Sequence, residues 1–233
     1  MNAPVPASPP ESGRTAALSA FTAGFIDTVG FVGLFGLFTA HVTGNFVLIG
    51  AAIVTHHSGV IAKLLALPTF IVAVALVSLF LRHCRRAGRP PIAPLLMAEA
   101  VLLTAFMISG LALGPFTGGD QPAAILTGLI GVLAMGVQNA ASRTVFAHLS
   151  PTTVMTGNVT QMVLDLVSLT ERDRPADEAK ARIRKMLPPV MAFAVGAIAG
   201  GLGFAVAGFW CVVAGVAAIL AMLLFNPAAE AKA

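Results

Sequence analysis

The sequence has little charge for its length. Only 10% of its 233 residues are Asp, Glu, Lys or Arg, whereas 57% are hydrophobic, and an ordinary soluble domain is about 25% charged. A water-facing surface cannot be built from so little charge, so the composition excludes a soluble globular enzyme, a disordered chain and a nucleic-acid-binding domain. The mean hydropathy of +0.90 predicts an integral membrane protein.

The sequence also has few residues suited to chemistry. Its two cysteines, Cys84 and Cys211, are too few and too far apart for a disulfide framework or a metal cage. No Walker loop, dinucleotide glycine motif, nucleophile elbow or HExxH motif is present. We therefore expect no enzyme, no ATP-driven pump, no cofactor and no metal. Residues 1–13 predict a flexible tail, and no signal-peptide cleavage pattern follows them.

Apolar runs predict six membrane-spanning helices, because about 20 apolar residues are needed to cross a bilayer. Two shorter apolar segments, Thr43–Val54 and Thr156–Leu169, are left over. Near the end of the chain, Gly196 and Gly200 predict a small-residue face for helix packing. The predicted spans are residues 14–38, 63–82, 92–114, 121–147, 185–206 and 208–226.

The two short segments decide the topology. If both cross the membrane, the eight spans place the two most basic loops, Arg82–Arg89 with four Lys/Arg and Glu171–Lys185 with six, on opposite faces. The positive-inside rule disfavours that arrangement. If both segments are re-entrant, the two basic loops and the N- and C-termini all lie in the cytoplasm. Six spans with two re-entrant half-helices is the better interpretation, with residues 170–185 as a cytoplasmic loop whose second half, Ala176–Met186, is compatible with a surface helix.

An internal repeat joins the two short segments. Thr43-Gly44-Asn45 and Thr156-Gly157-Asn158 lie 113 residues apart, and the upstream segments 24–27 (GFID) and 136–139 (GVQN) lie 112 apart. Each half crosses the membrane three times, so the second half must enter it in the opposite direction. This is the inverted-topology repeat of many secondary transporters, whose sites lie near the bilayer midplane at half-helices.

The predicted fold is therefore an all-α integral membrane protein with six transmembrane helices and two re-entrant half-helices in two inverted repeats. Repeat 1 is predicted at residues 14–115 and repeat 2 at residues 116–227. The segments GFIDTVGF…GLFTAHVTGNFVLIG and AMGVQNAASR…TTVMTGNVTQMVLDL resemble the signatures of the YoaK-like family of bacterial membrane proteins, from about Thr15 to Phe225. The resemblance implies a bacterial inner-membrane protein of this architecture and no particular activity.

The polar residues within the apolar segments are the candidate site. Asp27 lies deep in the first span, where a charge costs about 3 kcal/mol or more, so it is expected to pair, bind a cation or carry a proton. Gln138 and Asn139 are its uncharged counterparts. The alternative for all three is hydrogen bonding between helices. The other candidate solute-binding residues are those of the two TGN triplets: Thr43, Gly44, Asn45, Thr156, Gly157 and Asn158.

The TGN triplets have a physical rationale. A half-helix that begins inside the membrane exposes backbone N–H groups that water cannot satisfy. The threonines could cap these groups, the glycines allow a sharp turn and close approach, and the positive helix end suits an anion. The alternative is that the triplets only stabilise the fold. His41 and Glu99 join Asp27 as candidates for proton coupling.

The leading hypothesis is a small secondary transporter or permease that binds a small polar or anionic solute between the two half-helices. The alternatives are a passive channel and a membrane scaffold without transport. The expected partners are the lipid bilayer and a small-molecule or ion solute. A homodimer is also compatible, since sulfate and nucleobase permeases with crossed half-helices have roughly twice this length.

Overall fold

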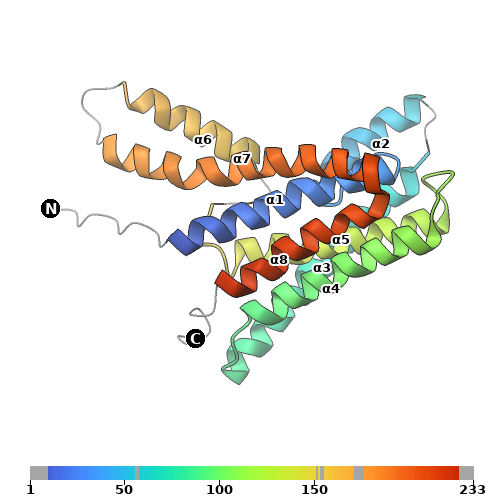
Figure 1. The fold of residues 1–233 in the computed structure, drawn as a ribbon, viewed down its shortest axis with the longest axis horizontal. Coiled ribbons are helices and arrows are strands. Elements are labelled where there is room, and N and C mark those ends of the chain that lie inside the picture. The colour runs from blue at the N-terminus through green and yellow to red at the C-terminus, as the bar shows by residue number, and fades with distance from the viewer. Residues whose placement is uncertain (1–9, 56–57, 151, 153–154, 171–175, 226–233) are drawn as a thin grey trace.

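The computed structural model describes residues 10–55, 58–150, 152, 155–170 and 176–225, and the regular secondary structure of this part is entirely helical. These residues form eight α-helices and one 3-10 helix, with no strand (Figure 1). The all-α class is as predicted. The helices are α1 Pro10–Gly33, α2 Gly44–Thr55, α3 Val60–Ala87, α4 Ile92–Leu113, α5 Pro122–Arg143, α6 Met155–Ser168, α7 Ala176–Ala207 and α8 Val213–Phe225, with the 3-10 helix η1 at Gly208–Val212.

Five stretches of the described chain are long and apolar enough to cross a membrane. Four of them are the helices α1, α3, α4 and α5, and the fifth, Ala176–Phe225, holds both α7 and α8. The chain reverses direction at η1, so α8 runs opposite to α7 (Figure 1). The predicted sixth crossing therefore rests on α8, whose 13 residues extend only about 20 Å. Six crossings stays a prediction.

The helix boundaries differ from the prediction at both ends of the chain. α1 begins at Pro10, inside the tail predicted at 1–13; residues 1–9 lie outside the described part. α7 begins at Ala176 and continues through Pro188 and Pro189. The second half of the predicted loop 170–185 is thus continuous with the spanning helix, because the alternating charges of that segment are compatible with an exposed helix.

Small residues hold α1 against α7. A Cβ on Gly24 would overlap the carbonyl oxygen of Phe193, and a Cβ on Gly196 or Gly200 would overlap a backbone carbonyl of α1. Because apolar lipid gives no hydrophobic force between helices, such close backbone approach is what stabilises them. The small-residue face predicted from Gly196 and Gly200 is confirmed.

The first helix ends earlier than the predicted residue 38. Gly33 is its last residue, and the next turn places Phe35 at φ 55° and Gly36 at φ 78°. Glycine adopts such left-handed angles readily, whereas phenylalanine does so at a cost. The chain then doubles back beside α1. Gly131 of α5 lies so near the methyl group of Thr39 that a Cβ there would sit 3.1 Å from it, so the returning stretch lies between α1 and α5.

The two short helices point in opposite directions. Both α2 and α6 begin near the middle of the molecule, and they run toward opposite ends (Figure 1). α2 has 12 residues and α6 has 14, or about 18 and 21 Å of helix. Both segments are short helices, as the apolar runs predict, and their re-entrant course stays a prediction.

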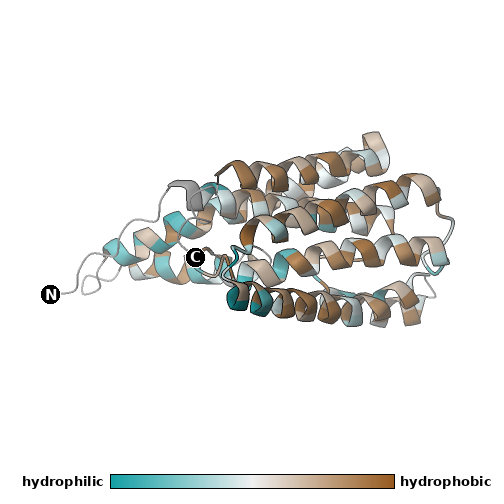
Figure 2. Cartoon of the chain, turned by 90° about the horizontal axis from the view of Figure 1, so that it is seen from below, coloured by the Kyte–Doolittle hydropathy of each residue, from teal (hydrophilic) through white to brown (hydrophobic). Residues whose placement is uncertain are grey.

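The polar residues gather at one end of the molecule (Figure 2). The Arg14 guanidinium lies 5.6 Å from the ring centre of Phe225, so the start of α1 and the end of α8 share that end. At the opposite end, the Asp120 carboxylate accepts hydrogen bonds from the N–H groups of Gly59 and Ile61 at the start of α3. We call the end that holds Arg14 and the arginines of residues 82–89 the basic end, and the end that holds Asp120 the opposite end.

Candidate functional site

Asp27 is buried on α1, and its side chain is 6% exposed. It lies six residues before Gly33, or about 9 Å from the end of the helix. Its carboxylate accepts hydrogen bonds from the N–H of Ala40 at 2.7 Å and from the N–H of His41 at 3.3 Å. The Asp27 carboxylate therefore fixes the stretch that leads into α2, which sequence reasoning did not foresee.

The His41 ring completes this contact. Its Nδ1 lies 2.7 Å from the second carboxylate oxygen of Asp27, and its side chain is 37% exposed. The ring also meets Phe193 of α7 edge-on, at 5.4 Å between ring centres. A neutral ring protonated on Nδ1 and a charged imidazolium both donate to the carboxylate. His41 can thus take up or release a proton at Nε2 without losing its bond to Asp27.

The Asn45 side chain hydrogen-bonds to the backbone of the stretch that doubles back before α2. Its amide oxygen accepts the N–H of Phe38, and its amide nitrogen donates to the carbonyl of the same residue, both at 2.9 Å. The residue is 1% exposed. The Asn45 amide thus satisfies both backbone groups of Phe38, as a paired residue on an adjacent strand would. The two bonds hold the first turn of α2 against the stretch before it.

Of the other members of the first triplet, Thr43 does not cap the helix, whereas Gly44 allows the close approach that was predicted for it. α2 begins at Gly44, so Thr43 occupies the N-cap position, but it is exposed. Backbone carbonyls satisfy the first amides of α2: the N–H of Gly44 bonds to His41, that of Asn45 to Val42, and that of Phe46 to Thr43. The threonine hydroxyl is therefore not needed as a cap at this helix. Gly44 lies against the Phe38 ring, where a Cβ would come within 3.1 Å.

The second triplet lies in the first turn of α6. Thr156 and Gly157 are exposed, whereas Asn158 is buried. The amide nitrogen of Asn158 lies 3.8 Å from the sulfur of Met155. Asn158 is thus buried like Asn45 but with different contacts, and residues 151 and 153–154 before it lie outside the described chain.

Gln138 is also buried, and it bonds to α1. Its amide nitrogen donates to the Ser19 carbonyl at 2.6 Å and contacts the Ser19 hydroxyl at 2.9 Å. That hydroxyl in turn donates to Thr152 at 3.2 Å. Ser19 lies eight residues before Asp27, or about 12 Å along α1, so the structure does not bring Gln138 to the carboxylate. Asn139 is partly exposed, and its side chain makes no hydrogen bond within the described residues.

Glu99 stands apart from the Asp27–His41 pair. It is 1% exposed on α4, and its Oε1 has no hydrogen-bond partner among the described residues. α4 packs against α5, α8 and η1. Glu99 therefore remains a buried carboxyl on a separate helix, and no hydrogen bond joins it to Asp27 or His41.

Helix α6 and the stretch just before α2 both contact α7. Asp165 near the end of α6 forms a two-pronged ion pair with Arg182 of α7, at 2.7 and 3.1 Å. The Arg182 guanidinium lowers the pKa of the Asp165 carboxyl. Helices α6 and α7 run antiparallel from this ion pair. Ten residues back from Asp165 along α6 and ten residues forward from Arg182 along α7 both cover about 15 Å. Met155 at the start of α6 therefore lies beside the turn of α7 that carries Phe193. The His41 ring contacts that same phenylalanine.

Several polar residues escaped the sequence reasoning. Thr39 and Thr152 are buried, at 0% and 2% exposure, and their hydroxyls both contact α1. They too are separated by 113 residues, so extending the TGN match upstream would have found them. Lys63 donates to the carbonyls of Phe35 and Gly59 at 2.7 and 3.2 Å, a contact that no repeat signals.

Among the described residues, no group of three or more His, Cys, Asp or Glu side chains is placed to hold a metal ion. The long apolar helices and the buried polar contacts between them define a multi-pass membrane protein.

The chain belongs to the family described as "Protein of unknown function (DUF1275)", which matches residues 15–225. It is 31% identical over 150 residues to the UPF0700 transmembrane protein YoaK of Bacillus subtilis (strain 168), and the match covers 64% of each chain. The YoaK-like resemblance of the TGN segments is therefore confirmed. No solved structure matches the chain.

Proposed function

We propose that this membrane protein is a small secondary transporter that moves a small polar or anionic solute together with a proton. The proposal includes six crossings in two inverted repeats, with both termini in the cytoplasm of a bacterial inner membrane. The observation that carries it is the Asp27–His41 pair, a buried carboxylate bonded to a partly exposed imidazole where α2 begins.

The chemistry of this pair suits coupling. Buried carboxylates within membrane helices are costly and mark ion or solute pathways. His41 offers an exposed nitrogen that can gain or lose a proton near neutral pH, and its uptake changes the charge of the pair from −1 to 0. A solute anion beside the positive end of α2 would then bind more readily when His41 is protonated.

The paired half-helices support a site between the repeats. α2 and α6 both begin near the middle of the molecule and run apart (Figure 1), and His41 just before α2 contacts Phe193 of α7. Inverted repeats with half-helices that meet at mid-depth are the usual plan of solute sites in secondary transporters. The loop arginines at the basic end support a cytoplasmic location for that end by the positive-inside rule.

A scaffold without transport is the second candidate, and one observation favours it. The Asn45 amide group accepts one hydrogen bond from the Phe38 backbone and donates one to it. Gln138 likewise bonds to Ser19. These amides act as structural contacts, so the transporter proposal rests on Asp27 and His41 rather than on the asparagines. A homodimer, which no contact in one chain tests, is part of neither proposal.

Proton movement in proteoliposomes tests the function. Purified protein is reconstituted in vesicles loaded with a pH-sensitive dye, and a panel of small anions and polar metabolites is added outside. At least one solute is expected to drive saturable proton movement in the wild type. Asp27→Asn and His41→Gln should abolish that movement while leaving the folded yield unchanged.

Matched controls separate the alternatives. Glu178→Gln and His83→Gln remove the same functional groups at exposed positions of the basic end, and both should transport like the wild type. Loss of movement in the controls as well would contradict a role specific to Asp27 and His41. Solute flux that neither saturates nor carries protons would indicate a channel. Folded protein without any flux would indicate the scaffold.

A further inference from the structure

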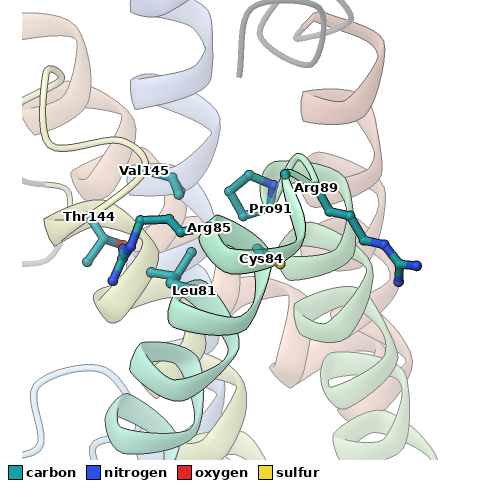
Figure 3. Close-up of a pocket in the computed structure, with 8 residues that line it drawn as sticks. Leu81, Cys84, Arg85, Arg89, Pro91, Thr144 and Val145 are labelled. Carbon is teal, nitrogen blue, oxygen red and sulfur yellow. The ribbon is translucent and has the colours of Figure 1, made fainter.

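A cavity of about 610 Å³ lies at the basic end of the molecule, away from the Asp27–His41 pair. The end of α3, the start of α4 and the stretch after α5 enclose it (Figure 3). Arg85 reaches toward Thr144, whereas the Arg89 side chain extends in the opposite direction, away from the other lining side chains (Figure 3). Both arginines come from one short stretch of chain beside the cavity.

The end of α3 explains why the cavity is open. Gly88 has φ 60° and ends the helix, with its N–H bonded to the carbonyl of Cys84. The N–H of Arg89 bonds to the same carbonyl at 3.0 Å. A Cβ on Gly88 would meet nothing within 4 Å, so no side chain fills the space beside this turn. The apolar side chains of Leu81, Cys84 and Val145 line the interior.

Positive charge around the cavity has no protein partner. The side chains of Arg85 and Arg89 form no ion pair or hydrogen bond with any described residue, whereas the Arg182 side chain is paired with Asp165. The segment Arg82–Pro91 contains no acidic residue. α4 begins beside the cavity with no side-chain cap and no acid in its first turn, and such a helix end adds further positive potential.

The depth of the cavity matches the lipid headgroups. α3 has 28 residues, or about 42 Å of helix, and the hydrocarbon core is about 30 Å thick. If α3 enters the core near its first turn, its last eight residues lie beyond the core on the basic side. An apolar interior and charged flanks at this depth suit a molecule that is itself apolar at one end and anionic at the other.

We propose that this cavity binds an anionic phospholipid, with Arg85 and Arg89 turning their unpaired guanidinium groups to its phosphate and its acyl chains leaving along the apolar side. Basic pockets between membrane helices on the cytoplasmic side are known to suit anionic lipid headgroups. Arginine is favoured for phosphate because its planar fork donates two parallel hydrogen bonds. The positive-inside rule alone would explain the number of arginines, but not the cavity between these two.

Binding of dioleoyl phosphatidylglycerol to the detergent-purified protein tests the proposal, with dioleoyl phosphatidylcholine as the lipid of equal chains and no net charge. Native mass spectrometry counts the lipids retained at increasing lipid concentration. We expect phosphatidylglycerol to be preferred, and Arg85→Gln with Arg89→Gln to weaken its binding by at least about thirtyfold, because the variant loses the charge-assisted hydrogen bonds of two guanidinium groups to the phosphate.

A matched pair from the same loop supplies the control. Arg82→Gln with Arg86→Gln removes the same charge at residues that do not line the cavity, so only a screened long-range attraction is lost and the loss should stay below about threefold. Val145→Phe narrows the interior without changing charge and should also weaken binding, which extends the test if one arginine variant folds poorly. Equal losses in the two arginine pairs, no preference for phosphatidylglycerol, or equally tight binding of inorganic phosphate would each overturn the proposal.

Discussion

Removal of the Asn45 side chain is expected to loosen the doubled-back stretch without touching any solute. Asn45→Ala deletes two hydrogen bonds to the backbone of Phe38, each 2.9 Å long. A neutral hydrogen bond contributes about 1 kcal/mol net, and side-chain bonds inside membrane proteins average about 0.6 kcal/mol. The expected loss in the free energy of unfolding is therefore about 1–2 kcal/mol, and somewhat more if the Phe38 groups stay unsatisfied.

Reversible unfolding in mixed micelles, followed by circular dichroism, measures this loss. Asn139→Ala is the control, because Asn139 is partly exposed and its side chain makes no hydrogen bond within the described residues. Its effect should stay within about 0.5 kcal/mol. Equal stability of the Asn45→Ala protein and the wild type would refute the claim that Asn45 stabilises the fold through its two hydrogen bonds to Phe38. A loss of solute binding alone would instead make Asn45 a binding residue.

Three further substitutions test contacts outside the candidate site. Gly200→Ala should cost about 1–3 kcal/mol by overpacking, whereas Gly201→Ala, whose Cβ makes ordinary contact at 3.4 Å, should be neutral or stabilising in the same unfolding assay. Lys63→Met should lower Tm, because it removes the donor to two carbonyls at the opposite end; an unchanged Tm contradicts this. Asp165→Asn should detach α6 from α7 and speed its hydrogen exchange. Because Arg182 lowers the pKa of Asp165, the wild type should lose this stabilisation only below about pH 4, and the variant should show no such acid step.

The sequence was sufficient for the helices but not for their ends. Long apolar runs predict α3, α4 and α5 to within a few residues, because chain length in a bilayer is set by its thickness. The end of α1 at Gly33 depends on the turn at Phe35 and Gly36, and no apolar run ends there. Hydropathy likewise could not predict that α7 begins at Ala176, because residues 176–185 are charged and the apolar run starts only after them.

The candidate site was predicted in part. Asp27 stood out because a lone acid in an apolar span is costly. Its partner His41 was named as a proton-coupling candidate, but their 2.7 Å contact depends on the returning chain. The role of Asn45 could not be predicted, since an amide at a half-helix can bind either solute or backbone. Contacts between distant segments, such as Ser19 with Gln138, carry no local pattern in the sequence.

The opposite directions of α2 and α6 are the central claim, and cysteine labelling tests it most directly. Thr55→Cys at the end of α2 and Thr170→Cys just after α6 are both exposed positions. They are placed one at a time in a protein whose Cys84 and Cys211 are replaced by alanine, and a membrane-impermeant maleimide is added to intact cells. Two re-entrant half-helices predict labelling of position 55 from outside and of position 170 only after the membrane is opened. Labelling of both positions from the same side would mean that at least one of α2 and α6 crosses the membrane, and would contradict the inverted repeat.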